Sequence, residues 1–192
     1  ADVVVIGPGL GQAVWGEKLL AAVLKMQIPR VVDADGLNLL ARQNLEKPLA
    51  DTIITPHAGE ASRLLRTDSR DIQSDRFKAT NLLVERWADV AVLKGAGTLV
   101  AGAGNRINVC DRGNPGMATA GMGDLLTGVI AALVGQGLDL FTAAAIGVYI
   151  HASAGDDVAE KGERGLKATD LLPFIRRRVN PLSKNRIIYE PV

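Results

Sequence analysis

The feature that most constrains this chain is the regular alternation of short β-branched runs with helix-like segments. The runs are VVVIG, RVVDAD, DTIITP and VAVLKG, and helical stretches separate them, the last of which continues to Trp87. This alternation predicts a mostly parallel sheet with helices packed on its faces. TLVAGAG and RINVCD, joined by Gly-Asn-Arg, predict a hairpin that adds antiparallel strands to that sheet.

The second half of the chain has a different pattern, with helices only. Helical segments are expected over 124–134, 142–161 and 168–179. The apolar run 138–154 is interrupted by polar residues, which favours a buried helix over a membrane span. No repeat, low-complexity tract or linker divides the chain, so we predict a single domain over 1–192.

Composition excludes several classes of function. The net charge is +1 and aromatic residues make up 4% of the chain, so neither a basic field nor a set of stacking rings indicates nucleic-acid binding. Cys110 is the only cysteine, which excludes an internal disulfide framework and favours a reducing, cytoplasmic compartment. The strand pattern begins at Asp2 without a signal peptide, so we expect a fragment whose upstream part was removed or lies elsewhere.

Unusual residues follow the first two strands, where open α/β sheets bind ligands. GPGLG, residues 7–11, lacks the third glycine of a dinucleotide fingerprint because Gln12 occupies that place. Backbone amides lining a ligand pocket are favoured there, with a simple tight turn as the alternative. Asp33, Asp35 and Asn38 follow the second strand, and helix capping is favoured for at least one of them.

The third and fourth strands end in further polar motifs. His57 and Glu60 of ITPHAGE lie one helical turn apart and could face one cleft, or they could be a capping histidine and a solvated glutamate. The only other histidine is His151, so a metal site built from this pair alone is not expected, and a carboxylate-rich site would suit Mg²⁺ and not Zn²⁺. Lys94 of VLKGAGT is followed by glycines like a phosphate cradle, but the Walker spacing is absent.

NPGMATAGMGDLLTG then begins a helix whose free N–H groups form an anion site. Asp124 stands at this positive end, where a carboxylate gains about 0.3–1 kcal/mol. It is either a helix cap or a catalytic base beside a bound phosphate. The surrounding glycines have low helix and strand propensity. A simple cap does not require this cost, so the catalytic role is favoured.

Together, GPGLG, DADGLNLL, ITPHAGE, VLKGAGT and NPGMATAGMGDLLTG resemble the ADP/ATP-dependent NAD(P)H-hydrate dehydratase family of the ribokinase-like superfamily, in its order and approximate spacing. The resemblance implies a ribokinase-like three-layer sandwich, a mostly parallel sheet with helices on both faces, whose usual amino-terminal part is missing. It also implies ADP or ATP as co-substrate, Mg²⁺, small-molecule substrates, a homo-oligomer and, often, an epimerase domain fused upstream. Neither nucleic acid nor a membrane is expected as a partner.

The implied activity is dehydration of the 6S hydrate of NADH or NADPH while ADP is split to AMP and phosphate. By motif, the nucleotide contacts are Lys94, Gly95, Ala96, Gly97, Thr98, Gly121 and Gly123, and the hydrate contacts are Gly9, Gly11, His57 and Asp124. Asp124 would deprotonate the hydrate hydroxyl as it attacks the terminal phosphate. Glu60 falls where the superfamily often positions Mg²⁺ through water.

Two alternatives remain open from the residues. One is a small-molecule kinase of the same fold that acts on a vitamin-like alcohol. The other is a nucleotide-binding fragment without activity.

Overall fold

The computed structural model describes residues 1–180, so the end of the predicted 1–192 domain lies outside the described residues. Within them, one six-stranded sheet has its strands in sequential order. The strands are β1 (Val4–Ile6), β2 (Arg30–Val32), β3 (Leu49–Ile54), β4 (Ala88–Leu93), β5 (Thr98–Gly102) and β6 (Arg106–Cys110). β1 to β4 are parallel, whereas β5 and β6 pair antiparallel, which confirms the predicted sheet and hairpin.

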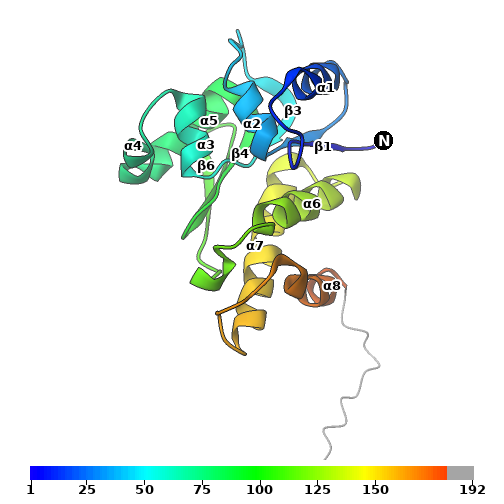
Figure 1. Cartoon of the computed structure of the whole chain (residues 1–192), viewed down its shortest axis with the longest axis vertical. Coiled ribbons are helices and arrows are strands. Elements are labelled where there is room, and N and C mark those ends of the chain that lie inside the picture. The colour runs from blue at the N-terminus through cyan, green and yellow to red at the C-terminus, as the bar shows by residue number, and fades with distance from the viewer. Residues whose placement is uncertain (181–192) are drawn as a thin grey trace, which may run out of the picture.

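The helices that connect the parallel strands cover one face of the sheet (Figure 1). They are α1 (Val14–Leu24), α2 (Ala34–Leu40), α3 (Ala58–Leu65), α4 (Ser69–Ser74) and α5 (Arg76–Trp87). Right-handed crossovers that add each strand on the same side place all their helices on one face. Val32, Ile54 and Leu93 of the strands pack into the core beneath these helices.

The other face is covered by helices from the second half of the chain (Figure 1). They are the 3₁₀ turn η1 (Pro115–Met117), α6 (Met122–Gly135), α7 (Leu140–Ala159), the 3₁₀ turn η2 (Ala168–Leu171) and α8 (Leu172–Val179). Val31 and Ile53 point into this second core, because neighbouring residues of a strand face opposite sides. The three-layer arrangement predicted from the sequence is therefore confirmed.

The long helix expected before β4 is in fact divided into α3, α4 and α5. Arg66 ends α3 in the left-handed conformation, with φ 53°. Asp75 is the N-cap of α5, and its Oδ1 accepts a hydrogen bond from the Lys78 N–H at 2.9 Å. The prediction of one helix was wrong because the apolar periodicity continues through these local stop and start signals.

The later helices also differ at their ends. α7 begins at Leu140, earlier than expected, because Asp139 Oδ1 accepts a hydrogen bond from the Thr142 N–H at 3.0 Å. The segment expected as one helix over 168–179 is η2 followed by α8, with Pro173 in the first turn of α8.

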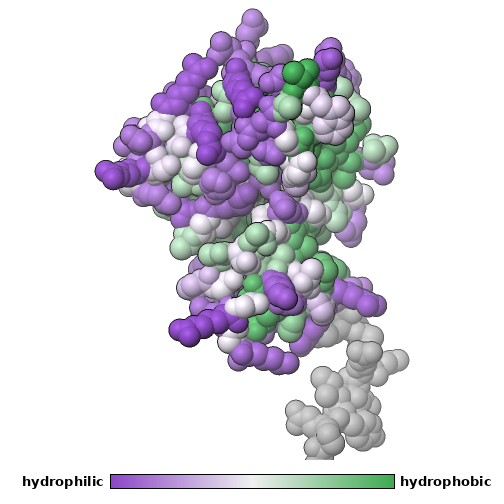
Figure 2. All heavy atoms as spheres, in the orientation of Figure 1, coloured by the Kyte–Doolittle hydropathy of each residue, from purple (hydrophilic) through white to green (hydrophobic). Residues whose placement is uncertain are grey.

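The surface is mostly polar, and apolar side chains gather on the side where β1 and α1 lie (Figure 2). The large apolar side chains exposed there are Val5, Val14, Trp15 and Leu19. Within residues 1–180, no helix combines the length and apolar character needed to cross a bilayer.

Candidate active site

The polar motifs meet at the edge of the sheet formed by the carboxyl ends of β1 to β4. The parallel strands all end there, so side chains that follow them in the sequence converge. Lys94 Nζ lies 2.7 Å from Asp33 Oδ1 and 3.8 Å from Glu60 Oε2, so it joins motifs from three strands. The N-terminus of α6 meets the same group, since a Cβ on Gly123 would lie 3.1 Å from Lys94 Nζ.

Asp33 is the buried anchor of this cluster, with 1% of its surface exposed. Its Oδ1 accepts from Lys94 Nζ, and its Oδ2 accepts from Thr127 Oγ1 at 2.9 Å. Burial by itself raises the pKa of Asp33, but the Lys94 ammonium and hydrogen bonds from Lys94, Thr127 and Thr55 outweigh it and lower the pKa below its ordinary value. Asp33 is therefore a carboxylate at neutral pH and holds Lys94 and α6 in place.

The capping role expected near Asp33 is wrong for all three polar residues of that motif. Asp33 precedes α2, yet its side chain makes no capping hydrogen bond. Asp35 instead accepts from the Gly11 N–H at 2.9 Å, and Asn38 accepts from Arg63 at 3.0 Å. The side chains turn away because other elements of the fold offer them partners.

Gly9 and Gly11 lie in the exposed loop after β1. Their φ angles are 65° and 73°, which favour glycine, and the bond to Asp35 anchors the loop at Gly11. A Cβ on either residue would meet nothing within 4 Å, so the loop presents open backbone. The preceding Gly7 is different, because a Cβ there would lie 1.7 Å from the Asp33 carbonyl oxygen. This close approach couples the loop to the Asp33 backbone.

His57 and Glu60 form a reciprocal cap at the start of α3. His57 Nδ1 accepts from the Gly59 and Glu60 N–H groups at 3.0 and 3.3 Å, while Glu60 Oε2 accepts from the His57 N–H at 2.8 Å. The capping alternative for His57 is confirmed, whereas the alternative of a solvated glutamate is wrong because Glu60 is buried. The imidazole is 55% exposed, so His57 keeps a face open to the site edge.

Glu60 is poorly arranged as a direct metal ligand. Oε2 is engaged by the cap, and Oε1 lies 3.4 Å from His57 Nε2. Within residues 1–180, no group of three or more histidine, cysteine or carboxylate side chains is arranged to hold a metal ion. An indirect role for Glu60 through water stays a prediction.

The α6 N-terminus has the features of an anion site. Gly121 begins the helix with φ 84°, a conformation that glycine adopts without strain. The N–H groups of Met122, Gly123 and Asp124 have no hydrogen-bond acceptor in the part of the chain that the structure describes. The Asp124 side chain is exposed and makes neither a capping bond nor an ion pair with any described residue. A capping bond by Asp124 is therefore absent from this geometry.

The turn after Lys94 has the same character. Gly95 and Gly97 have φ angles of 147° and 65°, and the N–H groups of Gly95, Ala96 and Gly97 find no acceptor among residues 1–180. Thr98 Oγ1 donates to the Gly95 carbonyl at 3.0 Å, which closes the turn. The turn therefore offers free amide donors, while its one hydroxyl is used internally.

A buried histidine lies behind α6, on α7. His151 is 6% exposed, and its Nε2 has no hydrogen-bond partner among the described residues. Burial lowers the pKa of His151 to about 4, against a smaller opposite effect of a hydrogen bond with the Met122 backbone. His151 is neutral at physiological pH and contacts the turn that carries Asp124.

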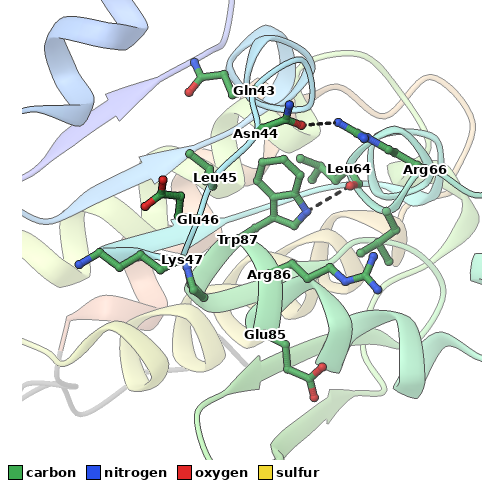
Figure 3. Close-up of a pocket in the computed structure, with 12 residues that line it drawn as sticks. Gln43, Asn44, Leu45, Glu46, Lys47, Leu64, Arg66, Glu85, Arg86 and Trp87 are labelled. Carbon is green, nitrogen blue, oxygen red and sulfur yellow. Dashed lines mark hydrogen bonds between the residues drawn. The ribbon is translucent and has the colours of Figure 1, made fainter.

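A cavity of about 390 Å³ lies at the opposite end of the sheet, near the amino ends of β3 and β4 (Figure 3). Trp87 donates to the Leu64 carbonyl at 3.1 Å, and Arg66 donates to Asn44 at 2.8 Å on its walls. None of the predicted site residues lines it. The convergence of motifs, and not this cavity, therefore identifies the candidate active site.

Sequence reasoning placed Lys94, Gly123 and Glu60 in one site, and the structure brings them together. It missed Asp33 as the partner of Lys94 and missed Thr127 altogether. One signal was available: Gly123 and Thr127 lie four residues apart on a helix, so both face the same neighbour. The identity of that neighbour required the fold.

Comparisons with known proteins bear on the family of this chain. A family model described as NAD(P)H-hydrate dehydratase matches residues 1–177. The bifunctional NAD(P)H-hydrate repair enzyme Nnr of Coxiella burnetii is 54% identical over 182 residues, which cover 94% of this chain and 37% of that protein. The ADP-dependent (S)-NAD(P)H-hydrate dehydratase of Neisseria meningitidis is 38% identical, covering 94% of this chain and 64% of that protein. This chain therefore spans less than two thirds of each relative.

A solved structure shows the same fold. The ADP/ATP-dependent NAD(P)H-hydrate dehydratase of Bacillus subtilis, co-crystallised with ATP and Mg²⁺, superimposes with a TM-score of 0.81 at 27% identity. The match covers 92% of this chain and 63% of that one. The ribokinase-like fold predicted from the sequence is confirmed.

Proposed function

The chain belongs to the NAD(P)H-hydrate dehydratase family, and on this premise we propose that it dehydrates hydrated NADH or NADPH while splitting ADP into AMP and phosphate. One observation carries the proposal: Gly123 of the α6 turn lies beside Lys94 of the β4 turn, since a Cβ on Gly123 would lie 3.1 Å from Lys94 Nζ. Two loops whose amide donors have no acceptor among residues 1–180 therefore meet near one ammonium group. A phosphate is the ligand that suits such a set of donors.

In the proposed reaction, the loop at Gly95–Thr98 holds the nucleotide and the α6 N-terminus holds its terminal phosphate. Lys94 and the free amides of α6 stabilise the negative charge that develops during transfer. Asp33 supports this role indirectly, because it keeps the Lys94 ammonium beside Gly123.

Asp124 is the proposed general base. Its exposed carboxylate, which has no partner among residues 1–180, takes the proton of the hydrate hydroxyl as the oxygen attacks the terminal phosphorus and the bond to AMP breaks. The carbon–oxygen bond of the phosphorylated hydrate then breaks, and the neighbouring ring carbon gives its proton to water. The ring double bond is restored, and the hydrate oxygen leaves with phosphate.

Gly9, Gly11 and His57 are the proposed hydrate contacts. The open backbone at Gly9 and Gly11 and the exposed face of His57 border the same edge of the sheet, which supports this assignment. Mg²⁺ is proposed to arrive with the nucleotide phosphates, with Glu60 near it only through water. A homo-oligomer and an upstream epimerase domain remain family-based predictions.

The test is a repair assay with purified protein, hydrated NADH, Mg²⁺ and either ADP or ATP. We expect the absorbance of reduced nicotinamide to recover and AMP and phosphate to accumulate in equal amounts with ADP. No recovery with either nucleotide would contradict the proposal. A stable phosphorylated alcohol, with no action on the hydrate, would instead support the kinase alternative.

A further inference from the structure

Arg76, the first residue of α5, reaches across to the turn that follows β4. Its Nη2 donates to the Leu93 carbonyl at 3.0 Å, and its Nη1 donates to the Ala96 carbonyl. The guanidinium also packs on Gly95, where a Cβ would lie 3.2 Å from Nη2. One side chain thus binds both ends of the glycine turn. No sequence motif singled out this residue.

Holding a carbonyl also orients the next amide. In a trans peptide the carbonyl oxygen and the following N–H point in opposite directions, and the described chain has no cis peptides. The Leu93 carbonyl faces Arg76, and the next N–H, that of Lys94, donates away from it to the Pro56 carbonyl at 2.9 Å. The Ala96 carbonyl also faces Arg76, so the Gly97 N–H of the same peptide points away from Arg76. That N–H has no acceptor among residues 1–180.

The turn needs such a restraint because, among the described residues, its own side chains supply only the hydrogen bond from Thr98 to the Gly95 carbonyl. Gly95 and Gly97 are both in positive-φ conformations and are free to rotate without strain. A mobile turn would have to be ordered each time a ligand binds, at a cost in affinity. Arginine suits the task because its planar fork donates in two fixed directions, which a lysine ammonium cannot reproduce.

We propose that Arg76 is a positioning residue of the nucleotide site: it holds the Leu93 and Ala96 carbonyls so that the Gly97 amide faces a phosphate of the bound nucleotide. The assignment rests on the proposed function for the identity of the ligand. Arg76 acts through the backbone of the turn, and the fork of its guanidinium matters more than its charge.

The test compares Arg76→Ala and Arg76→Lys with the wild type, with Arg86→Ala as a matched control. Arg86 is an exposed arginine at the other end of α5. ADP binding is measured by calorimetry in the presence of Mg²⁺, and the KM values for ADP and for the hydrate are measured separately. Both Arg76 variants should weaken ADP binding about tenfold or more, because a charge-assisted hydrogen bond no longer holds the turn. The KM for the hydrate and the Arg86→Ala variant should be unchanged.

Three results would overturn the assignment and leave the proposed function standing. The first is an ADP affinity that is unchanged in both Arg76 variants. The second is an ADP affinity that is retained in Arg76→Lys but lost in Arg76→Ala, which would indicate that the charge of the side chain matters and not its fork. Equal losses for ADP and hydrate, together with a lower melting temperature, would indicate a merely structural arginine. A wild type that binds no ADP would instead overturn the nucleotide site itself and the proposed function with it.

Discussion

Asp33 and Asp124 stand at the same edge of the sheet, one after β2 and one in the first turn of α6, yet their surroundings are opposite. Asp33 is buried, and both of its oxygens accept hydrogen bonds, from Lys94 and from Thr127. Asp124 is exposed and has no partner within residues 1–180. A buried charge must be paired to be tolerated, whereas a proton acceptor needs a free lone pair.

The comparison separates two tasks that the sequence could not tell apart. Asp33 is committed to holding Lys94 and α6, and its lowered pKa makes it a poor proton acceptor. Asp124 contributes nothing visible to the packing of the described chain and is available to a substrate. We expect that one carboxylate stabilises the protein and that the other carries the chemistry.

The largest expected effect is on turnover in Asp124→Asn. Loss of the general base should lower kcat by about 10² to 10⁴, while the melting temperature stays nearly unchanged because no contact is lost. The measurement is steady-state hydrate repair together with thermal unfolding. Surviving activity in this variant would contradict the role of Asp124 as general base.

Next in size is the effect of Asp33→Ala on stability. Removing one partner of a buried ion pair leaves the Lys94 ammonium with only the more distant Glu60 carboxylate among the described residues, and the free energy of unfolding should fall by about 3 kcal/mol. Urea unfolding measures the change, with Asp124→Ala as the control. The double variant Asp33→Ala/Lys94→Met should recover part of the loss. A loss as small as that of the control would show that the two carboxylates do not differ as described.

A third prediction separates the acid sensitivity of His151 from that of Asp33. Below pH 6.5 the unfolded chain binds a proton at His151 that the folded chain, with a pKa of about 4 there, does not bind. The free energy of unfolding should therefore fall by up to about 3 kcal/mol as the pH drops from 6.5 to 4. This figure follows from about 1.4 kcal/mol for each unit by which the pKa of His151 differs between the folded and the unfolded chain. The Asp33 contribution is lost only at lower pH, because its pKa is below 3.8.

Urea unfolding at a series of pH values tests this prediction. In the variant His151→Gln, the free energy of unfolding should no longer fall between pH 6.5 and 4 on account of this residue, whereas the loss at lower pH that comes from Asp33 should remain. An unchanged slope in that variant would assign the sensitivity to other groups.

The smallest expected effect concerns His57, whose side chain both caps α3 and faces the site. His57→Ala should cost about 1 kcal/mol of stability, typical of a lost N-cap, whereas His57→Asn should cost only a few tenths because Asn caps well. The KM for the hydrate should rise in both variants if the imidazole contacts the substrate. An Asn variant as unstable as the Ala variant would contradict the cap.

The sequence predicted the sheet, its hairpin and the three layers, because β-branched runs and apolar periodicity report local preference and burial together. The family resemblance also implied that Lys94, Gly123 and Glu60 lie in one site. The sequence did not predict the break at Arg66 or the turn of the Asp33 side chain away from α2. Each depends on one local conformation or one distant partner that periodicity does not encode.

By itself, therefore, the sequence determined the fold class and the family, and it predicted the edge of the sheet at which the site lies. Only the tertiary structure decided which carboxylate is held and which is free, and which arginine reaches the glycine turn. The physical reason is the separation in sequence over which each effect acts. Propensities and motifs depend on a few neighbouring residues, whereas the Asp33–Lys94 and Asp33–Thr127 contacts join positions 61 and 94 residues apart. Such contacts exist only after the layers have packed.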